Sequence, residues 1–321
     1  MKRREFIAAL GGAVAAWPLV ARAQQPMPLV GVLRINSRDV NEAFEEPFRR
    51  YMKELGWEEG RNVRFQFLWA GGQTEKLPGL ARELVAQKVN LIITFGNSGV
   101  QAVQQATASI PIVGMSDDMV GGELVVSMAR PGGNTTGISI LGKELDVKRL
   151  ELLHEFAPQA HSIAVLADPN LFGSRLQLEN AAHALGLELF VFTAQNRDEI
   201  ARALDAIEGA HVEAVNILTS PFLNAARNVI IERLRRDRLP SIFEWPESAH
   251  DGGLLGYGPR IVLAYRLVAG LVDKVLRGAA PGDLPIEQPT NFALVINLKT
   301  AKAIGLTIPE ALLLRADEVI E

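Results

Sequence analysis

Short apolar runs alternate with longer segments of helical periodicity along most of the chain, and residues 90–106 show the unit clearly. An apolar run ends at Phe95, a Gly-Asn-Ser-Gly turn follows, and a helix-like segment begins at once. A buried apolar run that feeds a helix is typical of a parallel strand in an α/β sheet. Gly96 permits the sharp turn, and Asn97 or Ser98 can cap the helix.

The same layout recurs in the second half of the chain, which indicates two similar units. The first unit has expected strands at 29–35, 62–69, 90–95 and 110–115 and expected helices at 40–55, 75–87 and 100–107. The second has expected strands at 162–167, 188–193, 213–218 and 239–243 and expected helices at 174–185, 198–207 and 223–236. We therefore predict an α/β protein with two doubly wound parallel-sheet lobes, whose strand ends face each other across a cleft.

Three connections between the units predict a three-segment hinge. Residues 134–141 lead out of the first unit, the glycine-rich run 252–258 leads back, and the proline-rich run 281–289 crosses again. These crossings assign residues 26–138 plus 253–283 to lobe one, and residues 139–252 plus 284–321 to lobe two. A hinge of three segments can bend without separating the lobes, which suits closure around a ligand.

The first 23 residues are expected to be a cleavable signal peptide. The basic start Lys2-Arg3-Arg4 precedes a short apolar run, and Ala21-Arg22-Ala23 fits the small-x-small cleavage rule. We expect cleavage after Ala23, and the paired arginines resemble a twin-arginine signal. A membrane anchor or a buried helix is the alternative, but a run this short that contains Pro18 is a poor membrane span.

Composition and charge narrow the function classes. The 321-residue chain has no cysteine, which excludes disulfides, thiolate metal sites and cysteine nucleophiles. Removal of residues 1–23 leaves 29 basic and 36 acidic residues, a net charge of −7. An exported acidic protein is a poor candidate for nucleic-acid binding. We interpret the arginine cluster at 233–238 as a solvated helix end.

Motifs for catalysis and for cofactors are incomplete. The run 137–144 resembles a P-loop, but Glu144 stands where Ser or Thr must hold magnesium. No Gly-x-Ser-x-Gly elbow occurs, and the five histidines lack metal-ligand spacing. We therefore expect no enzyme activity, no metal site and no cofactor; an exported α/β enzyme with a catalytic constellation in the cleft is a less favoured alternative.

Several segments resemble the ABC transporter substrate-binding protein family over essentially the whole chain. They are segments 2–7 and 21–25, the Arg-Pro-Gly-Gly-Asn-Thr-Thr-Gly run at 130–137, and segments 148–153 and 292–302. The resemblance implies the type 1 periplasmic-binding fold and an extracytoplasmic receptor that hands its ligand to an ABC permease in the inner membrane. Some members of this branch bind tryptophan or other aromatic amino acids. Members often carry Gly-Asp-Pro where this chain has Ser116-Asp117-Asp118, and we assign the acidic position to Asp117.

Polar and aromatic residues gather where the predicted strands end, at the edge where open α/β sheets bind ligands. Lobe one offers Asn36, Ser37, Asn97, Ser98 and Asp117; lobe two offers Asp168, Asn170, Thr219, Ser220, Phe222 and Glu244; Ser139, Tyr257 and Trp245 lie at or near the hinge. Each also has an ordinary interpretation as a cap, a turn former or a core aromatic. Because all fall at one edge, the set predicts a ligand-binding site.

The chemistry of this set suggests an amino-acid-like ligand. The helix start at Asn97 and Ser98 would bind a ligand carboxylate through its N–H groups. Asp117 or Glu244 would hold an ammonium group by a charge-assisted hydrogen bond. One of the three aromatic residues in the set would supply a flat apolar wall for the ligand's side chain.

Taken together, the sequence predicts a monomeric periplasmic receptor of an ABC importer, which closes around a small polar or amino-acid-like solute. An exported sensor that acts on a membrane signalling protein is the main alternative. A sugar-responsive DNA-binding regulator shares the expected fold, but it would need a helix-turn-helix where this chain has an export signal.

Overall fold

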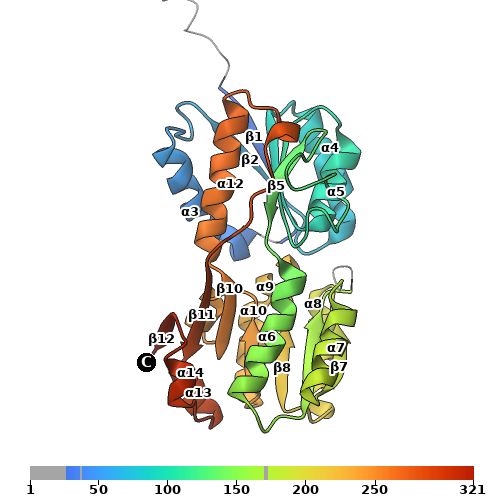
Figure 1. Ribbon diagram of the computed structural model, residues 1–321. Coiled ribbons are helices and arrows are strands. Elements are labelled where there is room, and N and C mark those ends of the chain that lie inside the picture. The colour runs from blue at the N-terminus through green and yellow to red at the C-terminus, as the bar shows by residue number, and fades with distance from the viewer. Residues whose placement is uncertain (1–26, 37, 170–172) are drawn as a thin grey trace, which may run out of the picture.

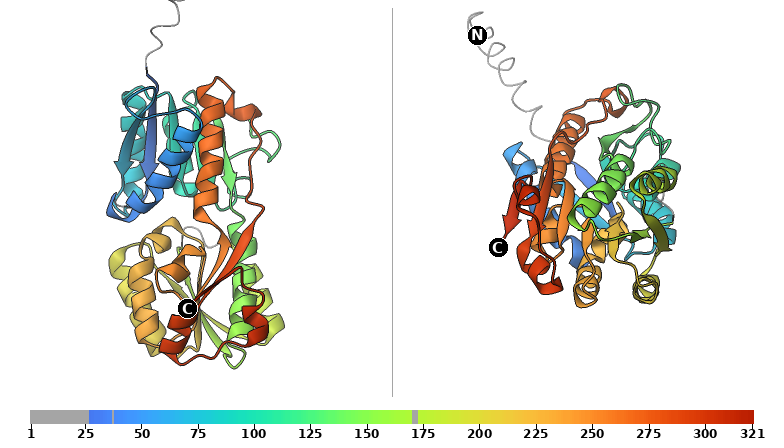
Figure 2. Two further views of the ribbon diagram at one scale, coloured as in Figure 1. Left: turned by 90° about the vertical axis from the view of Figure 1, so that its left-hand side faces the viewer. Right: turned by 60° about the horizontal axis from the view of Figure 1, so that its bottom comes forward.

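The protein consists of two α/β lobes stacked end to end, as shown in Figure 1 and from two other directions in Figure 2. The computed structural model describes residues 27–36, 38–169 and 173–321. The expected signal peptide, Ser37 and Asn170 therefore lie outside the described residues. Among the helices that are described, none is both long enough and apolar enough to cross a membrane.

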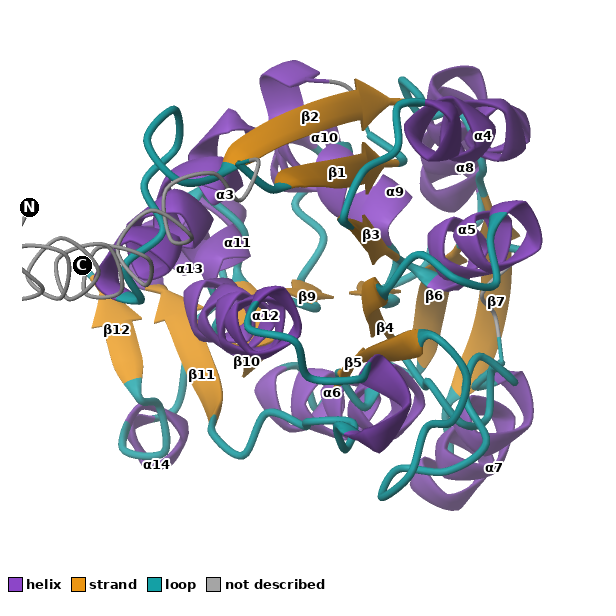
Figure 3. Cartoon of the chain, turned by 90° about the horizontal axis from the view of Figure 1, so that it is seen from above, coloured by secondary structure: helices purple, strands orange, loops and turns teal. Residues whose placement is uncertain are grey.

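Lobe one is built on a five-stranded parallel sheet with the strand order β2-β1-β3-β4-β5. Its strands are β1 (Leu29–Arg34), β2 (Arg64–Trp69), β3 (Leu91–Phe95), β4 (Ile112–Ser116) and β5 (Thr135–Ser139). Its helices are α3 (Arg38–Glu54), α4 (Leu77–Ala86), α5 (Asn97–Ala106) and α12 (Ile261–Leu276), with 3-10 turns η1 (Thr74–Lys76) and η2 (Pro281–Asp283). Figure 3 shows α3 and α12 on one side of this sheet and α4 and α5 on the other.

The continuous apolar strands of lobe one follow from burial on both faces of the sheet. Successive side chains of a strand point to opposite faces. In β3, Leu91, Ile93 and Phe95 enter the core under α12, whereas Ile92 enters the core under α4 and α5. A strand buried on both faces is apolar along almost its whole length, which is why 91–95 shows no alternation of apolar and polar residues and has Thr94 as its one polar residue.

Lobe two is built on a seven-stranded sheet with the order β12-β11-β10-β9-β8-β6-β7. Its strands are β6 (Ser162–Ala167), β7 (Glu188–Thr193), β8 (Ala214–Ile217), β9 (Ser241–Phe243), β10 (Leu255–Pro259), β11 (Phe292–Asn297) and β12 (Glu318–Ile320). Its helices are α6 (Gly142–Phe156), α7 (Arg175–Leu185), α8 (Arg197–Gly209), α9 (Pro221–Ala225), α10 (Arg227–Arg236), α11 (Glu247–His250), α13 (Leu298–Ile304) and α14 (Glu310–Leu313). All neighbouring strands are parallel except β10 and β11.

The lobe crossings differ in detail from those expected. The expected return to lobe one at residue 253 does not match the sheet, because β10 pairs with β9 and with β11 inside lobe two. The return therefore begins at α12. The third crossing also comes later than residue 284, since the Ile286 N–H donates to Met128 O of lobe one at 2.8 Å and the Glu287 N–H donates to Gly137 O at 3.0 Å.

The helix expected at 223–236 is wrong as a single element. It is divided into α9 and α10 at Ala226, whose backbone angles are φ −91° and ψ 3°. The Ala226 N–H donates to both Phe222 O and Leu223 O, which tightens the end of α9. Ser220 starts α9, because its hydroxyl accepts hydrogen bonds from the N–H groups of Phe222 and Leu223.

Helix α12 joins the last part of the chain to lobe one through its buried face. Leu271 on this helix is fully buried, while Leu263 on the same helix is 38% exposed. We expect Leu271→Ala to lower the free energy of unfolding by about 2–5 kcal/mol, because it removes packed methyl groups and leaves a cavity. Leu263→Ala is the matched control and should change it by less than about 0.5 kcal/mol. Denaturant unfolding of both variants tests this; equal losses would contradict the assigned packing of α12.

Candidate ligand-binding site

A cavity lies between the lobes at the carboxyl ends of the central strands. Its volume is about 50 Å³. It is lined by Arg34, Ile35, Asn36, Phe95, Gly96, Met115, Asp117 and Ile140 from lobe one and the first crossing, by Thr219, Pro221, Asn224, Glu244 and Trp245 from lobe two, and by Ile261 and Tyr265 from α12. This is the position at which open α/β sheets bind ligands.

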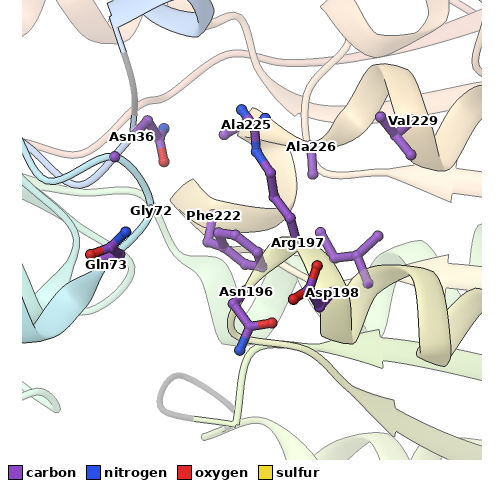
Figure 4. A pocket seen from close by; sticks show the side chains of 12 residues that line it. Asn36, Gly72, Gln73, Asn196, Arg197, Asp198, Phe222, Ala225, Ala226 and Val229 are labelled. Carbon is purple, nitrogen blue, oxygen red and sulfur yellow. The ribbon is translucent and has the colours of Figure 1, made fainter.

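A wider groove of about 470 Å³ opens between the lobes beside this cavity, and Asn36 lines both. Figure 4 shows Asn36, Gly72 and Gln73 of lobe one facing Phe222 and the start of α8 in lobe two. Phe222 has the main apolar ring of the groove, and a Cβ on Gly72 would lie 3.8 Å from that ring. The cavity thus lies next to a larger, partly apolar groove.

The two lobes touch each other around the cavity. The side-chain amide of Asn36 donates to Pro221 O at 3.1 Å. Gly96 lies against the same proline, because a Cβ at this position would be 3.1 Å from Pro221 Cγ. Lobe one therefore meets the start of α9 directly, and the arrangement is a closed one.

Gly96 itself is the N-cap of α5, with φ 76° and ψ 157°. Such angles are accessible to glycine and strained for other residues. The expectation that Asn97 or Ser98 caps this helix was wrong, since no side chain supplies a cap hydrogen bond. The physical reason is that the turn is tighter than expected, so that Asn97 already belongs to the helix.

A buried ion pair lies beneath the lobe-two side of the cavity. Arg149 of α6 is 1% exposed, and its Nη2 donates to Asp146 Oδ1 at 2.5 Å and to Thr219 Oγ1 at 2.6 Å. Its Nη1 donates to Tyr257 O at 3.1 Å. Asp146 also accepts from the Thr219 N–H at 3.1 Å and from the Ser174 hydroxyl at 2.9 Å. The pair therefore positions the end of β8, where Thr219 faces the cavity.

Carboxylates outnumber the cations that act on them in this region. Burial, together with the charges of Asp146 and Asp168, raises the pKa of Asp117 to about 8. The guanidinium of Arg149 and the ammonium of Lys143 act in the opposite direction but do not cancel this effect. None of the residues that the structure describes donates a hydrogen bond to the Asp117 carboxylate.

Glu244 is the second carboxylate that faces the cavity, and it is 5% exposed. Burial raises its pKa well above the usual range, and the charges of Asp117 and Asp146 add to this, while Arg149 opposes it. One of its oxygens accepts a hydrogen bond from the Ser220 N–H at 3.0 Å. Asp117 and Glu244 thus approach the cavity from opposite lobes, and each carries a pKa raised by burial and by its acidic neighbours.

The structure brings only part of the predicted set to the cavity. Its lining includes Asn36, Asp117, Thr219, Glu244 and Trp245, whereas Phe222 lines the adjoining groove. Ser37 and Asn170 lie outside the described residues. Neither space is lined by the remaining six predicted residues, Asn97, Ser98, Ser139, Asp168, Ser220 and Tyr257.

Most of these six residues form structural contacts instead. The Ser220 hydroxyl donates to Asp168 at 3.3 Å, and the Ser139 hydroxyl donates to the Asp117 carbonyl at 3.4 Å in the first crossing. The Asn97 side chain accepts a hydrogen bond from the Ser116 hydroxyl. Tyr257 packs against the core of lobe two. Their positions near strand ends were predicted, but the side chains of these five residues contact neighbouring protein groups and do not line the cavity.

The sequence interpretation missed the basic and aromatic part of the cavity. Arg34 is 5% exposed at the end of β1, and its guanidinium carbon lies 3.7 Å from the centre of the Phe95 ring. Its Nη1 donates to the Tyr265 hydroxyl at 2.7 Å. An arginine inside an otherwise apolar strand was the available signal. Tyr265 could not be found in this way, because α12 joins the site from a distant part of the chain.

A metal centre is not formed by the residues that the structure describes: no group of three or more histidine, aspartate or glutamate side chains is arranged to hold an ion.

Comparison with known proteins agrees with this architecture. The model of the family described as ABC transporter substrate binding protein matches residues 29–320. A tyrosine-binding protein from Clostridioides difficile (strain R20291) is 23% identical over 281 residues, which cover 86% of this chain and 81% of that protein.

Two solved structures share the fold over 92% of this chain and 100% of theirs. A conserved domain protein from Vibrio cholerae O1 biovar El Tor is 27% identical, with a TM-score of 0.83. The ABC domain from Streptococcus pneumonia in complex with L-Trp is 24% identical, with a TM-score of 0.82. The fold and family expected from the sequence are confirmed: the chain belongs to the ABC transporter substrate-binding protein family, which consists of extracytoplasmic solute receptors, and it has the type 1 periplasmic-binding fold.

Proposed function

We propose that the protein is the periplasmic receptor of an ABC importer and that it binds a small solute with a protonated amine between the lobes, in the space formed by the interlobe cavity and the adjoining groove. The observation that carries this proposal is the surplus of negative charge between the lobes, where Glu244, Asp146 and Asp168 are buried and Asp117 is partly buried. Under the same proposal, residues 1–23 are a cleaved export signal, the mature chain is a monomer, and an inner-membrane permease is its partner.

The charge argument favours an amine over a neutral solute. Two carboxylates in a desolvated space cannot both ionise without a large cost unless a cation lies between them. An ammonium group offers three hydrogen-bond donors and one positive charge. It would therefore restore ordinary ionisation at Asp117 and Glu244 while satisfying their oxygens.

The position of the two carboxylates also supports ligand-driven closure. Asp117 follows β4 of lobe one, and Glu244 follows β9 of lobe two. A cation that contacts both has more favourable interactions in the closed form than in the open form. Such a difference in affinity is what shifts a population towards closure. The three crossings provide the hinge for this motion.

Amino acids are the solute class that we place first within this proposal. The relatives include a tyrosine-binding protein and a domain in complex with L-Trp. The cavity has aromatic rings from Phe95, Trp245 and Tyr265, and the adjoining groove has that of Phe222. Flat apolar surfaces of this kind suit an aromatic or aliphatic side chain.

Removal of either carboxylate should weaken amine binding. We expect Asp117→Asn and Glu244→Gln each to reduce affinity for the best-binding amino acid of a panel that includes L-tryptophan and L-tyrosine by about 10- to 100-fold, because each removes a charge-assisted hydrogen bond. Asp118→Asn is the matched control; Asp118 pairs with Lys143 at 3.2 Å, does not line the cavity, and should keep wild-type affinity. Calorimetric titration gives the values. Wild-type affinity in both cavity variants would refute the amine site.

The raised pKa of Asp117 gives a pH dependence with a definite sign. In the ligand-free protein, the folded state binds this proton more tightly than the unfolded state, so its contribution to stability is complete below about pH 4 and is lost as the pH rises to about 8. Asp117→Asn should flatten this part of the profile. Denaturant unfolding at several pH values between 4.5 and 8.5 measures the free energy of unfolding of both proteins. A parallel fall in the variant would show that other groups cause it.

The transport role requires a test in cells. We expect deletion of the gene to abolish high-affinity uptake of the solute that binds the purified protein, and the wild-type gene to restore it. The double variant Asp117→Asn, Glu244→Gln should not restore uptake. Unchanged uptake after deletion, together with intact binding in vitro, would point to a receptor with a signalling role instead.

A further inference from the structure

Arg34 is a buried cation that faces the cavity without a carboxylate partner. Its side chain is 5% exposed and lies between the rings of Phe95 and Tyr265, at 3.7 and 5.4 Å from their centres. Within the described part of the chain, no acidic side chain forms an ion pair with it. Its Nε is buried and has no hydrogen-bond partner.

A comparison with Arg149 shows that the missing ion pair is the unusual feature, because the Nε of Arg149 also has no hydrogen-bond partner. Both guanidinium groups are buried in the same interlobe region, but Arg149 is matched by Asp146 and by two further acceptors. Among the described residues, the Arg34 guanidinium donates one hydrogen bond, from Nη1 to the Tyr265 hydroxyl at 2.7 Å. A guanidinium has five N–H donors and prefers planar, bidentate acceptors such as carboxylates. Burying its charge without an anion is costly, so an anionic group is the partner that this position lacks.

Arg34 shares the cavity with two carboxylates. Arg34, Asp117 and Glu244 all line the same space. Among the described residues, no ion pair joins Arg34 to either carboxylate. The wall of the cavity therefore carries a cationic group as well as anionic groups.

We propose that Arg34 binds the carboxylate of the solute, so that the ligand is a zwitterion with its amine at Asp117 and Glu244. This inference rests on the proposed amine site and adds the opposite charge. It also replaces the start of α5 as the carboxylate site. Neither Asn97 nor Ser98 lines the cavity, and the Asn97 side chain is already bonded to Ser116.

The competing explanation is that Arg34 only holds β1, β3 and α12 together through its two ring contacts. A structural role would affect every ligand equally, whereas a carboxylate contact affects only ligands that have a carboxylate. Matched ligand sets separate the two roles. Each set consists of an amino acid, the amine that lacks its carboxylate, and the acid that lacks its amine: L-tryptophan, tryptamine and 3-indolepropionate, with the corresponding sets for tyrosine, phenylalanine and leucine.

Calorimetric titration of the full mature protein with these sets is the test. In the wild type, the best-binding amino acid should bind at least about tenfold more tightly than its amine, which is the smaller value for a charge-assisted hydrogen bond. Arg34→Gln should lower the affinity for the amino acid by about 10- to 100-fold and change the affinity for the amine by less than about threefold. Arg64→Gln, which replaces an exposed arginine on neighbouring β2, should change neither.

Further variants keep the test decisive if Arg34→Gln does not fold. Arg34→Lys keeps the charge but loses the planar guanidinium. It should lower the affinity for the amino acid and leave the affinity for the amine unchanged. Tyr265→Phe removes the hydroxyl that accepts a hydrogen bond from Arg34 but keeps the ring. It should lower the affinity for the amino acid by a smaller factor than the Arg34 variants do, and leave the affinity for the amine unchanged. Equal affinity of the wild type for amino acid and amine, or equal losses for both ligands in the Arg34 variants, would overturn the proposal.

A measurement that needs no choice of ligand supports the same distinction. Solute that co-purifies with the protein can be released by heat and identified by mass spectrometry. A compound with both an amine and an anionic oxygen group agrees with the inference. An amine without an anionic group would overturn the role of Arg34 and leave the amine site standing. A compound without an amine would overturn the proposed function itself.

Discussion

The buried ion pair of Arg149 with Asp146 is the contact on which the cleft depends. It lies on the first helix after the chain enters lobe two, and it fixes Thr219 at the end of β8 and the backbone of Tyr257 in β10. Gly142 lets the same helix approach Asp117, because a Cβ there would lie 2.9 Å from Asp117 Cβ. One guanidinium thus orders three parts of the chain, and its charge only partly offsets the negative charge of the carboxylates that face the cavity.

That shortage of positive charge connects stability with binding. A desolvated carboxylate is tolerated in the ligand-free protein by taking up a proton, which is the meaning of the raised pKa of Asp117 and Glu244. A ligand that brings its own cation removes the need for the proton. Arg34 has the opposite charge. Because a guanidinium does not lose its proton, only a bound anion can compensate its charge. The cavity therefore has two opposite electrostatic deficits, too little positive charge at Asp117 and Glu244 and no anion at Arg34.

The sequence was most informative where burial alone decides the outcome. Continuous apolar runs such as Leu91–Phe95 predicted the parallel strands, because such strands are covered on both faces. The lobe membership of β10 was missed, since its antiparallel partner β11 is distant in the sequence. The lining of the cavity was predicted only in part. Residues at strand ends can be identified from the local sequence, but Tyr265 lies on a helix that reaches the cavity from a distant part of the chain. Ser220 and Asp168 were placed at the correct edge, yet they bond to each other there.

The most direct test of this account is a crystal structure of the mature protein with its co-purified solute or with the best-binding amino acid. The account predicts closed lobes and a ligand nitrogen within about 3.2 Å of a carboxylate oxygen of Asp117 or Glu244. It also predicts a ligand oxygen within the same distance of the Arg34 guanidinium. An uncharged solute in the cavity, or an amine that contacts neither carboxylate, would contradict the claim that charge compensation drives binding.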